Sequence, residues 1–170
     1  INEGYGGFSV SGNSIRYGLS AIKSVGRSVV DMIIREREAN GPFTTLEDFV
    51  TRMSNKEVNK RTLESFIKSG ALDSLPGTRK QKWIVAPDLL ESKAKEKKIG
   101  FEGQLSFFDL VGEEEKSSFQ IAMPPVGEYE KEELLAYEKE TLGIYVSGHP
   151  MEEYQDLWQK NVTARTSDFI

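Results

Sequence analysis

The 170-residue sequence predicts a mostly α protein: a small helical domain with a short N-terminal β-hairpin, a linker, and an acidic helical region. Apolar residues recur at helical spacing in several segments, and Gly, Pro or Asn stands near the ends of most of them. The charge also changes sign along the chain. Residues 14–99 hold 17 Lys and Arg against 11 Asp and Glu, whereas residues 100–170 hold 5 against 15. We therefore divide the chain into a helical domain (1–99), a linker (100–127) and an acidic helical connector (128–170).

The composition excludes several classes of site. There is no cysteine, which rules out disulfides, thiol nucleophiles and thiolate metal sites. No apolar run reaches the roughly 20 residues of a membrane span, so we expect a cytoplasmic protein with no membrane partner. The first residues carry neither a starting Met nor a signal-peptide pattern, which favours a fragment of a longer protein.

The N-terminal elements follow in order. Residues 8–17 alternate apolar and polar positions around Gly12-Asn13, which predicts a hairpin. Residues 18–24 form a short helical piece. Residues 25–40 predict a strong helix that Gly41-Pro42 ends, with one apolar face. The residues of that face are Val25, Val29, Met32 and Ile33.

Five further helices are expected. Residues 44–53 form a short helix, and residues 59–70 form another with Asn59 as N-cap. Residues 78–98 continue helically, although Pro87 should break or kink this segment or begin a new helix. An acidic helix spans residues 128–143, and a turn at Gly148-His149-Pro150 leads into a last short helix.

The segment from Leu19 to Glu38 has the form of a helix-hairpin-helix motif: a short helix, a tight Val-Gly turn and a longer helix. Such a turn leaves backbone N–H groups pointing outward at the positive end of a helix dipole, where a DNA phosphate can accept hydrogen bonds from them. Gly26 permits close approach, and Val25 should anchor the turn from inside. The usual pattern has a second glycine at position 24. The predicted DNA contacts here are Lys23, Ser24, Val25, Gly26, Arg27 and Ser28.

A looser second copy follows, in which a helix ends at Gly70 and a basic cluster opens the next helix. Its predicted DNA contacts are Gly70, Thr78, Arg79 and Lys80. For both copies a purely structural alternative stays open, because helix–turn–helix units with a glycine also occur as packing units whose lysines and arginines are only solvated.

Longer phrases resemble one family. "IRYGLSAIKSVG", "GPFTTLEDFVTRM", "NKRTLESFIKSGALDSL" and "LLAYEKETLGIYVSGHPMEEY" are similar, in order, to the C-terminal part of the bacterial replicative DNA polymerase III alpha subunit. The resemblance implies tandem helix-hairpin-helix motifs that hold duplex DNA, then a peptide that binds the sliding clamp (the beta subunit), and then an OB-fold domain. The expected partners are double-stranded DNA, the clamp and other domains of the parent polymerase.

The linker contains "QLSFF", which resembles the clamp-binding form Gln-Leu-Ser-Leu-Phe with one Leu replaced. The Gln amide can donate and accept hydrogen bonds, and the apolar side chains suit a groove. The alternative is that these apolar side chains pack on the helical domain and bind no partner. The predicted clamp contacts are Gln104, Leu105, Ser106, Phe107 and Phe108.

No catalytic residue is assigned to the chain. Polymerase chemistry needs clustered carboxylates that hold Mg²⁺, and the acids here lie in surface runs. We therefore expect no cofactor in this chain, with Mg²⁺ belonging to the parent polymerase. His149, the single histidine, is expected to have a turn role. The alternative function is a structural spacer between polymerase domains that makes no direct DNA contact.

Overall fold

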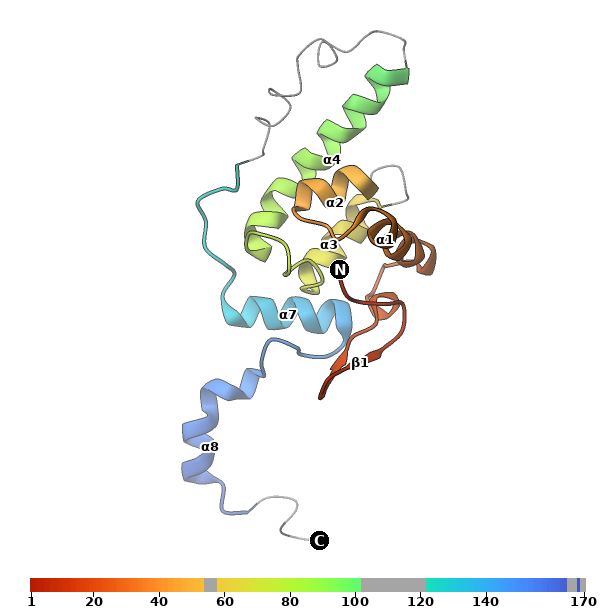
Figure 1. Cartoon of the computed structure of the whole chain (residues 1–170). Coiled ribbons are helices and arrows are strands. Elements are labelled where there is room, and N and C mark those ends of the chain that lie inside the picture. The colour runs from red at the N-terminus through yellow and green to blue at the C-terminus, as the bar shows by residue number, and fades with distance from the viewer. Residues whose placement is uncertain (54–57, 102–121, 165–167, 169–170) are drawn as a thin grey trace.

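A computed structural model describes residues 1–53, 58–101, 122–164 and 168 of the chain. The fold is mostly helical with an N-terminal hairpin, which confirms the predicted class (Figure 1). The two strands are β1 (Ser9–Ser11) and β2 (Ser14–Arg16), and the helices of the first domain are η1 (Leu19–Ala21), α1 (Arg27–Asn40), α2 (Leu46–Met53), α3 (Lys60–Lys68) and α4 (Arg79–Phe101). The acidic part contains α7 (Lys131–Leu142), η2 (Pro150–Tyr154) and α8 (Gln155–Asn161).

The hairpin forms where the apolar alternation predicts it. Val10 lies opposite Ile15 in the antiparallel register, and Gly12 takes a φ of 60° in the turn. That left-handed conformation is one that glycine adopts without steric cost.

One hydrophobic core joins the helices of the first domain. It contains Ile33 of the apolar face predicted for α1, together with Phe49 of α2 and Phe66 of α3, and each of the three has no exposed surface. The rings of Phe43, Phe49 and Phe66 meet edge to face in sequence, with centroids 5.0 and 6.0 Å apart. This geometry suits the opposite charges of aromatic faces and edges, and it fixes how α2 and α3 pack.

Helix α4 is longer and more continuous than the sequence suggests. It runs through Pro87, which neither ends it nor starts a separate helix. Proline lacks an N–H, so the helix loses a hydrogen bond at this point. Its first half packs on α2 and α3, and its second half extends beyond the body (Figure 1).

The acidic part has two different environments. Helix α7 lies against α3, whereas α8 extends away from the body (Figure 1). His149 takes the turn role expected of it, because its side chain caps η2 by accepting a hydrogen bond from the Met151 N–H, 3.1 Å away. None of the helices in the described ranges is long and apolar enough to cross a bilayer.

Candidate nucleic-acid interface

The first hairpin turn exposes its polar residues and buries its apolar ones. Ile22 and Val25 are 4% and 8% exposed, so they anchor the turn in the core as predicted for Val25. Between and after them, Lys23, Ser24 and Gly26 face solvent. The Val25 N–H donates to the Ile22 carbonyl over 3.2 Å, which closes the turn.

Ser24 has a φ of 66°, in the left-handed region that non-glycine residues rarely adopt. This is the position where the usual motif has a second glycine. The turn therefore has, at Ser24, a backbone conformation that glycine adopts without steric cost.

The N-terminus of α1 carries uncompensated positive charge. Gly26 is the N-cap and brings no side-chain hydrogen bond, and the first turn contains no acidic residue. The first N–H groups of any α-helix lack intrahelical acceptors, and the helix dipole adds partial positive charge there. Arg27 and Ser28 are exposed on this turn. The arrangement therefore suits an external anion.

Gly26 has no conformational reason to be glycine. Its φ of −76° is accessible to every residue type, and an added Cβ would lie 3.7 Å from its nearest neighbour, the Ser28 Oγ. The fold would accept a side chain at this position. A side chain at position 26 would instead obstruct the approach of a ligand to the outside of the turn.

Gly70, by contrast, is required by the fold. It has a φ of 76°, and an added Cβ would lie 2.2 Å from the Arg79 guanidinium. That guanidinium is buried between two carboxylates: it lies 2.7 Å from Asp73 and 3.0 Å from Glu138. Arg79 is only 6% exposed, so its charge pairs with carboxylates of the protein and does not face solvent. The geometry does not support the expectation that Gly70 and Arg79 meet DNA.

The N-terminus of α4 already holds an anion from the same chain. The carboxylate of Glu128 accepts hydrogen bonds from the backbone N–H groups of Arg79 and Lys80, at 2.8 and 3.0 Å. Thr78 and Gln81 cap each other through their side chains and backbone N–H groups. Although burial disfavours the charged form of Glu128, these backbone hydrogen bonds lower its pKa. The place predicted for a phosphate is thus taken by a carboxylate.

Two cations that are not among the predicted DNA contacts lie beside the first turn. Lys60 and Arg61 open α3 and are exposed. The Thr62 hydroxyl donates to the Ser24 carbonyl over 3.5 Å, which ties the start of α3 to the turn. The signal was available in the sequence, since two cations directly after an N-cap Asn oppose the helix dipole and call for an explanation.

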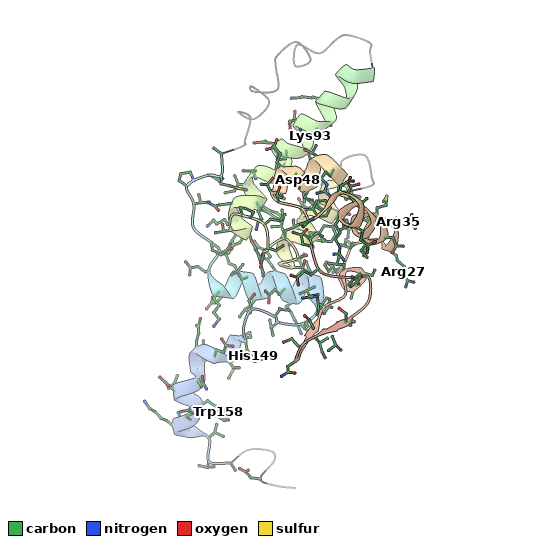
Figure 2. All side chains as sticks on the ribbon, viewed as in Figure 1. Arg27, Arg35, Asp48, Lys93, His149 and Trp158 are labelled. Carbon is green, nitrogen blue, oxygen red and sulfur yellow. The ribbon has the colours of Figure 1, made fainter. Side chains whose placement is uncertain are left out.

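A polar hollow of about 170 Å³ lies between these elements. Lys23 and Ser24 of the turn line it from one side, and Arg61 and Lys68 of α3 line it from another. Glu140 of α7 closes the hollow and pairs with Lys68 at 2.9 Å. The side of the protein that bears Arg27 lies away from the arm that bears His149 and Trp158 (Figure 2).

The predicted clamp contacts, Gln104 to Phe108, lie outside the described residues. Within the described ranges, no group of three or more His, Cys, Asp or Glu side chains is placed to hold a metal ion.

Comparison with known proteins agrees with this geometry. Residues 1–82 match the description of the helix-hairpin-helix motif. The chain is 41% identical over 155 residues to the DNA polymerase III subunit alpha of Borreliella burgdorferi, covering 91% of this chain and 14% of that protein. It is 40% identical over 168 residues to the subunit from Deinococcus radiodurans, covering 99% of this chain and 12% of that protein. The subunit from Thermus aquaticus is 40% identical over 160 residues, which is 92% of this chain and 12% of that protein.

The fold and the exposed hairpin define a helix-hairpin-helix protein. The resemblance stated from the sequence is confirmed: the chain belongs with the bacterial DNA polymerase III alpha subunits. It spans about an eighth of the length of those relatives.

Proposed function

We propose that this chain is a non-catalytic part of a replicative DNA polymerase, and that it binds the backbone of duplex DNA through the turn that precedes α1. The observation that carries the proposal is Gly26, which lies at a helix N-terminus without a side-chain cap, needs no special φ, and has room for a Cβ, whose nearest neighbour would be Ser28 Oγ at 3.7 Å. Lys23 and Arg27 flank it and are exposed. Contacts of this kind read no base sequence, so binding should be independent of sequence and sensitive to salt.

The test is a titration of fluorescent duplex DNA with the full chain at several salt concentrations. Replacing Lys23 and Arg27 by Ala should weaken binding about equally on any sequence and reduce the salt slope by about two, because each lost phosphate contact removes about one. Lys160→Ala, a change of the same charge on the distant α8, is the control and should change little. Unaltered affinity in the double variant would favour the spacer alternative.

We also propose that Gln104 to Phe108 dock on a sliding clamp. The support is the resemblance of this stretch to the clamp-binding pentapeptide and its place after the helix-hairpin-helix region. Burying each apolar side chain contributes roughly 1.5–3 kcal/mol, and ordering the peptide opposes this, so affinity on the order of micromolar is expected.

Clamp binding is tested with purified clamp by calorimetry. Replacing both Gln104 and Phe108 by Ala should abolish the heat of binding and leave the melting temperature of the chain nearly unchanged. If the melting temperature falls by many degrees, the two side chains belong to the core and the packing alternative is correct.

For the parent protein we propose a DNA-directed DNA polymerase whose Mg²⁺ ions bind outside this chain. The isolated chain should therefore extend no primer when supplied with template, nucleotides and Mg²⁺. Primer extension that persists through purification from host polymerases would contradict this division of labour.

A further inference from the structure

Besides α7, whose first turn also contains Glu132 and Glu133, three described helices open with cations, and they differ in how those cations are neutralised. Neither α1, α3 nor α4 has an acidic residue in its first turn. Positive side chains at this end oppose the helix dipole, so each start is electrostatically unfavourable unless an anion is supplied from elsewhere.

At α4 the protein supplies the anions itself. Asp73 and Glu138 neutralise the Arg79 side chain, and Glu128 accepts the free N–H groups. Lys82, the third cation of this cluster, is 1% exposed and donates its Nζ to the Leu72 carbonyl at 2.9 Å. Of the cluster, Lys80 alone keeps part of its side chain in solvent, where its Nζ lies 5.5 Å from the centre of the Tyr129 ring.

At α1 and α3 the conflict persists. Among the described residues, no carboxylate pairs with Lys23, Arg27 or Arg61. Lys60 lies 4.0 Å from the half-buried Glu64, and Glu64 and Glu140 line the hollow beside Arg61 without pairing with it. These two helix starts lie next to each other, because Thr62 bonds to Ser24 and both elements line the same polar hollow.

We infer that Lys60 and Arg61 make a second contact to the DNA backbone beside the first turn, and that the start of α4 makes none. This rests on the proposed function and specifies which surface carries it. The backbone of the duplex passes from the start of α1 to the start of α3, so that its phosphates lie against two helix starts whose first turns contain no acidic residue. At the start of α4, the Arg79 and Lys82 side chains are buried and bonded within the protein, and Arg79 holds Glu138 of α7 in place.

The test compares two pairs of cations in the full chain by titration of duplex DNA at several salt concentrations. Replacing Lys60 and Arg61 by Ala should weaken binding on every sequence and lower the salt slope by about two. Lys80→Ala should leave affinity and slope near those of the unaltered chain. Because Lys60 and Arg61 are exposed and oppose the dipole, their loss should not lower the melting temperature.

The outcomes separate the two proposals. Weaker binding for the Lys23 and Arg27 variant but not for the Lys60 and Arg61 variant would overturn this inference and keep the proposed function. The inference is also overturned if Lys80→Ala weakens binding as much as the α3 variant does. If neither pair matters, or if the unaltered chain does not bind, the proposed function itself fails.

Discussion

Gly26 and Gly70 are the same residue type in two turns, and the structure gives them different roles. Both glycines were predicted to contact DNA, and Gly26 was expected to permit close approach of the phosphate. The sequence pattern around Gly70 does not reveal that a buried guanidinium fills the space beside it. The role of each glycine depends on its backbone conformation and on the residues that pack against it from elsewhere in the chain. The local sequence pattern indicates part of the conformation and nothing of those distant neighbours.

A pair of alanine variants separates the roles. Gly26→Ala should leave the free energy of unfolding nearly unchanged, because the added methyl group makes only an ordinary contact with Ser28 Oγ, and it should weaken DNA binding, because it obstructs the approach of a phosphate to the turn. Gly70→Ala should lower the free energy of unfolding by about 2 kcal/mol or more, since it combines a left-handed φ with a collision against Arg79. Chemical denaturation measures both. Equal stability losses would mean that Gly26 is also a structural glycine.

Ser24 offers a test of backbone strain. A non-glycine residue at a φ of 66° costs about 1–2 kcal/mol, and glycine gives back about 0.5–1 kcal/mol through the greater freedom of the unfolded chain. Ser24→Gly should therefore stabilise the protein by about 0.5 kcal/mol. Ser24→Val should destabilise it, because a β-branched side chain tolerates this conformation poorly. A lower denaturation midpoint for Ser24→Gly would contradict the assignment of strain.

At the level of elements, local pattern predicted most of the fold. The hairpin, the helices and the apolar faces of α1, α2 and α3 lie where alternation, helical spacing and capping residues place them. Two features were not predictable locally. Pro87 suggested a boundary inside α4, but packing of the residues on either side of it holds one helix together. The start of α4 was predicted to contact phosphate, and the two carboxylates Glu128 and Glu138 that bind there could not be foreseen, because they lie 49 and 59 positions from Arg79 in the sequence.

The start of α3 should show a conflict between stability and binding. Arg61→Glu replaces a cation that opposes the helix dipole with an anion that favours it, so the free energy of unfolding should rise by about 0.3–1 kcal/mol. DNA binding should fall further than in Arg61→Ala, because the new charge repels phosphate. Denaturation and DNA titration of one preparation give both values. A variant that is both less stable and unchanged in binding would refute this description of α3.

For the molecule as a whole, α7 packs on the helical domain and does more than connect. The Tyr17 hydroxyl donates to the Leu142 carbonyl, and the Lys23 N–H donates to the Thr141 carbonyl. Glu138 has no exposed surface and pairs with Arg79. The division at residues 99/100 and 127/128 stays a prediction, but these bonds tie α7 to the first domain more closely than the term connector suggests.

Acid should loosen this attachment. Burial disfavours the charged form of Glu138, but hydrogen bonds from Ser147, Val146 and Arg79 outweigh it and hold the pKa of Glu138 below its usual 4.5. A lowered carboxyl pKa adds stability that is complete above the unfolded-state pKa and is lost as pH falls through the folded-state pKa. Stability should therefore decline below about pH 4.5. Glu138→Gln should flatten that decline, whereas the exposed control Glu133→Gln should keep it.

Removing the acidic segment should destabilise what remains. A chain that ends at residue 99 leaves Arg79 with Asp73 but without Glu138, and breaking a buried ion pair in this way costs about 3 kcal/mol or more. A chain that ends at residue 148 keeps the pair. Thermal unfolding should therefore give a lower melting temperature for residues 1–99 than for residues 1–148. Equal melting temperatures would show that α7 contributes nothing to the fold.

The length of α4 sets a working distance. With 23 residues and a rise of about 1.5 Å per residue, its two ends stand roughly 34 Å apart. The near end is fixed in the body by Arg79, and the far end stands clear of it (Figure 1). A partner protein that binds residues just beyond Phe101 would contact the chain about one helix length away from the start of α4. The duplex site proposed at the start of α3 lies beside the middle of α4, since Lys60 lines a pocket with Pro87 and Leu90, so only the second half of α4 would separate that duplex from a clamp bound beyond Phe101.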